Sequence, residues 1–264
     1  VVIMANVDWA EAFKRMFVPD IRLDPQAITL IVAVFGTTIS PYLFFWQSSQ
    51  EVEELDDDPD AEPLKEVPPD SREELRRIRL DTLIGMGFSN AIALAIMIAT
   101  AATLHASGQT NIESAAQAAE ALRPVAGPFA FALFAVGIIG TGLLAVPVLA
   151  GSTAFATAEC QGWKCGLEYK PWQAWGFYAV IALAMGLGVL IDFSPIDPIQ
   201  ALVWSAVING VVAVPIMAVM MILAGRTSVM GVFTATPVQL VLGWLATAVM
   251  AAAAVAMFGF PCPP

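Results

Sequence analysis

Long apolar runs separated by short polar connections make up most of this sequence. A first run covers residues 27–50, and the later runs are 81–104, 127–157, 173–191, 198–224 and 233–258. Each is long enough to cross a bilayer core of ~30 Å as a helix. The pattern predicts about six membrane-spanning helices, with about five of them in residues 80–264. With 58% hydrophobic and 13% charged residues, the fold class is an all-α membrane protein, a polytopic helical bundle.

The run 27–50 contains a sequence that disfavours a continuous helix. Residues 36–41 read Gly-Thr-Thr-Ile-Ser-Pro, and Pro41 has no backbone N–H and clashes with the preceding turn. We therefore expect residues 27–50 to form a broken transmembrane helix. In hydrocarbon a freed carbonyl must be satisfied by protein, water or an ion, and the carbonyl end of the first half would attract a cation. The alternative is a plain proline kink.

The segments beside this broken helix are more polar. Residues 1–26 are interpreted as the end of a membrane helix plus an interfacial segment. Residues 51–79 form an acidic loop that holds about half of the 23 Asp and Glu and explains the net charge of -11. If that loop is cytoplasmic, eight of the 12 Lys and Arg lie inside, as the positive-inside rule favours. The loop is either a solvated linker or an acidic funnel that gathers cations.

Ionisable residues are absent from the middle of these runs, which contain no Asp, Glu, Lys, Arg or His well inside. A proton relay built on intramembrane carboxylates or histidines is therefore excluded for this part of the chain. Hydroxyl and amide groups remain, and Asn90 and Asn209 are either site residues or interhelical contacts. Cys160 and Cys165 have no His nearby, so a metal site there is disfavoured. No catalytic triad or nucleotide-binding loop occurs, so we expect neither an enzyme nor a nucleic-acid partner.

Residues 36–41, followed by Tyr42 to Ser49, resemble the broken sixth helix of the natural resistance-associated macrophage protein (NRAMP) family of divalent-metal transporters. The family pattern there is roughly Gly-Ala-Thr-x-Met-Pro-His, then a second His before Ser. Residues 81–90 resemble the seventh helix, and residues 133–151 resemble the eighth. The resemblance extends in order over nearly the whole chain.

The resemblance implies a leucine-transporter-like fold of two inverted repeats, of which this chain carries the second repeat and one further helix. The missing N-terminal repeat would be its partner. The family's carbonyl ligand falls at Thr37 and its metal-binding Met falls at Ser40, while Tyr42 and Gln47 replace its two His. Weaker metal candidates are Gly36, Thr38, Tyr42, Gln47, Asn90 and Asn209. Because Ser offers a hard oxygen in place of a thioether, Mn²⁺ or Mg²⁺ is favoured.

The expected function is secondary transport of a divalent metal cation by alternating access around residues 27–50. The cation is the substrate, and no cofactor is implied. Two alternatives remain: an organic-solute or amino-acid symporter on the same fold, with a carboxylate bound by the N–H groups after Pro41, and a non-transporting membrane subunit. The location expected is a bacterial inner membrane, in contact with lipid, with residues 51–79 in the cytoplasm.

Overall fold

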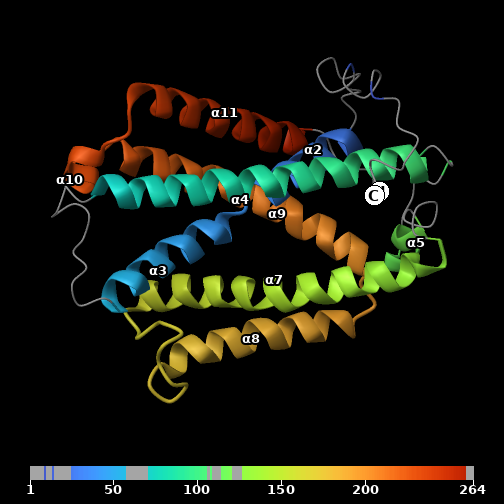
Figure 1. The fold of residues 1–264 in the computed structure, drawn as a ribbon, viewed down its shortest axis with the longest axis horizontal. Coiled ribbons are helices and arrows are strands. Elements are labelled where there is room, and N and C mark those ends of the chain that lie inside the picture. Colours follow the sequence, from blue (N-terminus) through green and yellow to red (C-terminus); the bar gives the residue numbers. More distant parts are fainter. Residues whose placement is uncertain are drawn as a thin grey trace. The chain divides into compact units, whose positions relative to one another are not determined.

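The computed structural model describes residues 9, 14, 25–57, 71–105, 108, 114–120 and 127–259, and regular secondary structure in this part is entirely helical (Figure 1). The helices are α2 (Pro25–Thr38), α3 (Pro41–Asp57), α4 (Ser71–Thr100) with a π-helix at Ala101–His105, α5 (Ala115–Glu120), α7 (Ala130–Gln161) after a 3₁₀ turn at Gly127–Phe129, α8 (Trp175–Asp192), α9 (Pro198–Ala224), α10 (Thr227–Met230) with a 3₁₀ turn at Gly231–Phe233, and α11 (Pro237–Gly259). Most of the predicted interfacial segment 1–26 lies outside the described residues.

Six helical segments of the described chain are long and apolar enough to cross a membrane. They are Pro25–Leu55, Glu73–Thr103, Gly127–Gln161, Trp175–Asp192, Pro198–Ala224 and Pro237–Gly259. This confirms the number of spans expected from the hydrophobic pattern. The protein is an all-α polytopic integral membrane protein.

Proline residues define where several of these helices start. Pro25, Pro41, Pro198 and Pro237 each occupy the first helical position. Proline suits this position because its missing N–H would have had no partner within the helix and its φ is already close to the helical value. Proline lacks the N–H that a helix interior requires, and it is therefore found at the first position of these four helices.

Both ends of the predicted acidic loop 51–79 are helical, and residues 58–70 between them lie outside the described residues. α3 continues through Glu51 to Asp57, and α4 begins at Ser71. Leu and Glu in this stretch are good helix formers, and Glu53 makes contacts that hold the end of α3. Its Oε1 accepts a hydrogen bond from the N–H of Leu167 (2.9 Å), and its Oε2 accepts one from Nε2 of Gln50 (2.7 Å).

The chain divides into two compact units, and each is described by itself. One contains α4 from Glu73, α5, α7 as far as Leu143 and the beginning of α9 as far as Ala201. The other contains α2, α3, α7 from Leu144, α8, α9 from Leu202, α10 and α11. The interrupted helix and its packing partners all belong to this second unit.

Within the second unit, α2 packs against α9 and α11. Val32 and Ala33 of α2 form a buried cluster with Ala206 and Val207 of α9. Ala253 and Met257 of α11 pack against this cluster. The side chains in the contact are small or medium-sized, so the backbones of α2 and α9 approach closely.

In contrast, α3 packs against α7 and α8. A second buried cluster joins α7 to the beginning of α8, and Trp46 of α3 packs against it. The ring centroids of Trp46 and Phe155 lie 5.8 Å apart at an interplanar angle of 79°, and those of Phe155 and Phe177 lie 4.8 Å apart at 64°. Both are favourable edge-to-face arrangements. The two halves of the interrupted helix are therefore held by different sets of helices.

Candidate functional site

The interruption lies between Thr38, where α2 ends, and Pro41, where α3 begins. The N–H of Ile39 still donates to the carbonyl oxygen of Phe35 (2.7 Å), which continues the pattern of α2. The N–H of Leu43 donates to the carbonyl oxygen of Ser40 (3.0 Å), which closes the first turn of α3. Since Pro41 has no N–H, it cannot donate to the carbonyl of Thr37. The helix is thus broken where the proline and the residues before it predict.

The hydroxyl groups beside the break all donate to nearby carbonyls. Oγ of Ser40 donates to the carbonyl oxygen of Thr37 at 3.0 Å. Oγ1 of Thr37 and Oγ1 of Thr38 both donate to the carbonyl oxygen of Val34, each at 2.8 Å. A hydroxyl that donates its proton keeps lone pairs for other ligands. The break therefore combines three neutral oxygens with the negative end of the α2 dipole, an arrangement suited to a hard cation.

Burial differs among the residues of the break. Ser40 is buried, with 7% of its surface exposed, and Gly36 is buried against α9. Thr37 and Thr38 are exposed in this chain. Among the described residues, no three or more His, Cys, Asp or Glu gather in a group that could hold a metal ion. The charge needed to balance a divalent cation is therefore not gathered around this break by the described residues.

The other predicted site residues are spread over α3, α4 and α9. Tyr42 lies in the first turn of α3, and Gln47 is exposed further along the same helix. Asn209 is half-buried on α9, directly before Gly210, whose backbone approaches Val32 of α2. Asn90 is exposed in the other unit, and its Nδ2 donates to the carbonyl of Met86 in its own helix at 2.9 Å. This hydrogen bond of Asn90 lies within its own helix, whereas a site role or an interhelical contact was predicted for its side chain.

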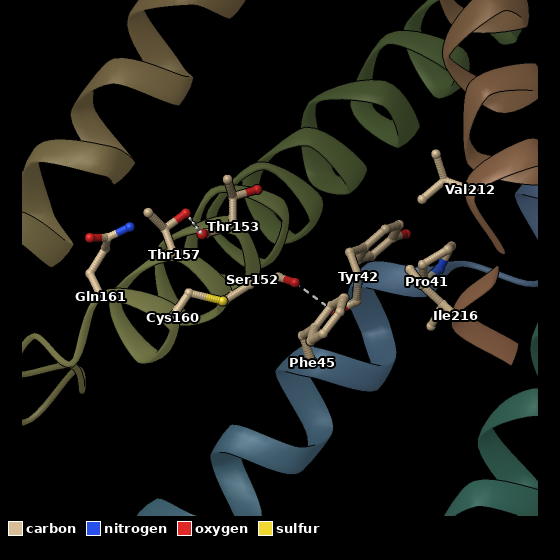
Figure 2. A pocket seen from close by; sticks show the side chains of 11 residues that line it. Pro41, Tyr42, Phe45, Ser152, Thr153, Thr157, Cys160, Gln161, Val212 and Ile216 are labelled. Atoms are coloured by element: carbon tan, nitrogen blue, oxygen red, sulfur yellow. Dashed lines mark hydrogen bonds between the residues drawn. The ribbon is translucent and has the colours of Figure 1, made fainter. Parts of the chain in front are cut away.

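A cavity of about 460 Å³ lies beside the break, between α3, α7 and α9 (Figure 2). Its wall is formed by Pro41, Tyr42, Phe45, Ser152, Thr153, Ala156, Thr157, Cys160, Gln161, Val212 and Ile216. We call it the α3–α7 groove. It begins at the first residues of α3 and reaches the last residues of α7, and hydroxyl, amide and thiol groups from α7 lie along it (Figure 2).

Two polar contacts between α3 and α7 were not predicted as contacts. Oγ of Ser152 donates to the carbonyl oxygen of Tyr42 (2.7 Å), and Oγ of Ser49 donates to Oε1 of Glu159 (2.9 Å). Glu159 was missed because the predicted span ended at residue 157, whereas α7 continues to Gln161. The spacing of Ser152, Phe155 and Glu159, by three and then four residues, places them on one face of a helix. That spacing was the available signal for an interhelical contact.

Cys165, in the connection between α7 and α8, is half-buried and has acidic neighbours. Burial raises the pKa of the Cys165 thiol above its ordinary value, and the nearby carboxylates of Glu159, Glu53 and Glu168 raise it further. Since the thiolate is the reactive form, a raised pKa slows the reaction of this cysteine at neutral pH.

We expect a maleimide to modify the two described cysteines at different rates. In a Cys262→Ser background near neutral pH, exposed Cys160 should be labelled first and Cys165 about threefold or more slowly. Labelling of Cys165 should accelerate as the pH rises toward its raised pKa, and Glu168→Gln should accelerate it at constant pH. Mass spectrometry of peptides after timed quenching measures both rates. Equal rates in all conditions would contradict the assignment.

Taken together, these observations define a class: polytopic helical membrane proteins in which one span is interrupted around a polar site. A sequence model of one family of this class, described as natural resistance-associated macrophage protein-like, matches residues 1–259. The chain belongs to this family.

Curated relatives support the same placement. The chain is 28% identical over 262 residues to the divalent metal cation transporter MntH of Deinococcus radiodurans, an alignment that covers 95% of this chain and 53% of the relative. It is 28% identical over 213 residues to MntH of Brucella suis, with 78% and 43% covered. For MntH of Caldanaerobacter subterraneus, the identity is 24% over 244 residues, with 92% and 53% covered. The chain therefore spans about half the length of the curated relatives it matches.

Proposed function

We propose that this chain is part of a secondary transporter that moves divalent metal cations by alternating access around the break between α2 and α3. The observation that carries this proposal is the interruption itself, where Pro41 leaves the carbonyl of Thr37 without a helical N–H partner. The hydroxyl of Ser40 donates to this carbonyl (3.0 Å), and the second lone pair of the carbonyl oxygen is the one proposed to bind a cation. The curated relatives named above are divalent metal cation transporters.

The carbonyl oxygen of Thr37 and Oγ of Ser40 are the proposed ligands from this chain. Their chemistry favours hard cations such as Mn²⁺ and Mg²⁺, which prefer oxygen ligands and retain some of their water. The further candidates are Gly36, Thr38, Tyr42, Gln47, Asn90 and Asn209. Of these, Thr38 and Tyr42 lie at the break itself, and Asn209 lies on the helix that packs against α2.

The proposed site is completed by an N-terminal repeat of the same protein, in a leucine-transporter-like fold. Such a repeat would supply the negative charge that the residues of this break lack, and it would cover the exposed Thr37 and Thr38. We propose that the metal is the transported substrate and not a resident cofactor. On this proposal the protein is not an enzyme. We place it in a bacterial inner membrane with the acidic segment 51–79 in the cytoplasm.

The test is cation uptake by proteoliposomes that contain the full-length protein. We expect saturable Mn²⁺ uptake that excess Mg²⁺ reduces and that a mixture of amino acids leaves unchanged. Inhibition of uptake by amino acids, or transport of the amino acids themselves, would favour the symporter alternative. Folded protein that moves neither class of solute would contradict the transport proposal and favour a non-transporting membrane subunit.

A further inference from the structure

We propose that Ser152 of α7 is a positioning residue: it holds the first turn of α3 and thereby fixes Ser40 for cation binding. The inference rests on the proposed function as far as the predicted effect on cation uptake is concerned. The contact itself is a property of the structure, and it can be tested without any transport measurement.

The hydrogen bond of Ser152 crosses from one helix to another. Its Oγ donates to the carbonyl oxygen of Tyr42 at 2.7 Å (Figure 2), and Ser152 has only 1% of its surface exposed. Leaving a buried polar group without its partner costs free energy, so this bond is expected to matter for how α3 is held. The bond joins α7 to α3 at Tyr42, which is two residues after Ser40.

Other hydroxyls on the same stretch of α7 behave differently. Oγ1 of Thr153 donates to the carbonyl of Leu149 (3.0 Å), and Oγ1 of Thr157 donates to the carbonyl of Thr153 (2.7 Å). Both bonds lie within α7, which is the usual partner of a helical hydroxyl. Ser152 differs from them because its hydroxyl donates to a carbonyl of α3 and not to one of its own helix.

Apolar contacts place α3 closely enough for this bond to form. Trp46 lies against Gly151, where a Cβ atom would come 2.5 Å from a carbon of the indole ring. Phe155 meets the same ring edge to face. One turn further along α3, Ser49 is bonded to Glu159. We call these contacts, together with the Ser152 bond, the α3–α7 seam.

The seam fixes the position of the first turn of α3 against α7. The carbonyl of Ser40 accepts the N–H of Leu43 (3.0 Å), so Ser40 and Tyr42 belong to one hydrogen-bonded turn. Trp46 and Ser49 hold later turns, whereas Ser152 is bonded to the turn that contains the proposed ligand. A ligand set works only if its supporting contacts hold it within a few tenths of an ångström. Loss of the Ser152 bond should therefore weaken cation binding more than it changes turnover.

The first test is Ser152→Ala in the full-length protein, with Mn²⁺ uptake measured as KM and maximal rate. We expect the KM to rise about fivefold, as for the loss of one hydrogen bond, with a maximal rate per folded protein within about twofold. Ser152→Cys has nearly the same shape and a weaker donor, so it should give an intermediate KM. Thr157→Val removes a hydroxyl bonded within α7 and is the matched control, with the wild-type KM expected.

The second test measures the position of α3 directly. Spin labels are attached to Cys160 and to Leu43→Cys, in a background with Cys165 and Cys262 replaced by Ser, and their dipolar coupling gives the distance distribution. Ser152→Ala should broaden or shift this distribution, and Thr157→Val should leave it unchanged.

The outcomes separate the inference from the proposed function. An unchanged distribution in Ser152→Ala would overturn the positioning role, whatever the transport results. An unchanged KM with less folded protein would make Ser152 a purely structural residue, and this also overturns the inference. A wild-type protein that moves no divalent cation would overturn the proposed function, and in that case the spin-label result still decides whether Ser152 holds α3.

Discussion

Replacing Gly36 with alanine is expected to lower the thermal midpoint of unfolding and the yield of folded protein, although alanine is the better helix former. A Cβ atom at this position would overlap the carbonyl oxygen of Ala206 and would lie 2.6 Å from the backbone nitrogen of Gly210. Both neighbouring atoms belong to the backbone of α9. They cannot move aside by a change of rotamer, so α2 and α9 would have to separate.

The expected cost exceeds the intrinsic gain in helix propensity. Alanine is favoured over glycine inside a helix by about 0.5–1 kcal/mol. Overpacking a tight contact costs about 1–3 kcal/mol and sometimes more, and here the clash is with backbone. Against a total stability of about 5–15 kcal/mol for a typical protein, a net loss of about 1–2 kcal/mol leaves most molecules folded at equilibrium but lowers the thermal midpoint, and losses of this size reduce abundance in the cell several-fold.

Gly186→Ala in α8 is the matched control. A Cβ atom there meets no atom of the described chain within 4 Å, so this variant should be as stable as the wild type or slightly more so. The yield of monodisperse protein in size-exclusion chromatography after detergent extraction, and the thermal midpoint of unfolding, compare the two variants. A Gly36→Ala protein with wild-type yield and midpoint would show that α2 and α9 are further apart than this structure places them.

This contact also affects how Gly36 is interpreted. The sequence made Gly36 a weaker metal candidate because of its place in the Gly-Thr-Thr-Ile-Ser-Pro stretch. The structure gives it a packing role against Ala206 and Gly210. Reduced transport in a Gly36 variant would therefore follow from lost packing and would not by itself identify a ligand.

Local chemistry explains which parts of the fold could be predicted. The break was predictable because the restriction at Pro41 depends only on its own ring and the preceding turn. The spans were predictable because a bilayer requires about 20 apolar residues in each helix. Both features are contained in short windows of sequence.

Long-range pairing could not be predicted in the same way. Ser49 and Glu159 are 110 residues apart in sequence, as are Tyr42 and Ser152. Hydropathy separates apolar from polar stretches but does not say which helix a given hydroxyl will meet. The distribution of α2 and α3 over different packing partners therefore became visible only in the structure, and so did the role proposed for Ser152.

On the proposed function, replacing Ser40 with a sulfur ligand is expected to change which metals the protein prefers. Oγ of Ser40 is a hard oxygen beside the break and lies within reach of the carbonyl of Thr37 (3.0 Å). A thioether or thiol in its place would favour softer cations such as Cd²⁺ and would weaken the binding of Mg²⁺. The ratio of Cd²⁺ to Mg²⁺ affinity should rise about tenfold or more in Ser40→Met.

Because Ser40 is buried, the larger methionine could also disturb packing, and two further variants separate the effects. Ser40→Cys supplies sulfur at nearly the original size, so it should shift the preference in the same direction. Ser40→Ala removes the oxygen without adding sulfur, so it should weaken Mg²⁺ binding and gain no Cd²⁺ affinity. Competition of Mn²⁺ uptake by each metal, normalised to folded protein, measures the ratios. If Ser40→Cys and Ser40→Met fold normally and keep the wild-type order of metals, Ser40 is not a ligand and the oxygen donors at the break must be reassigned.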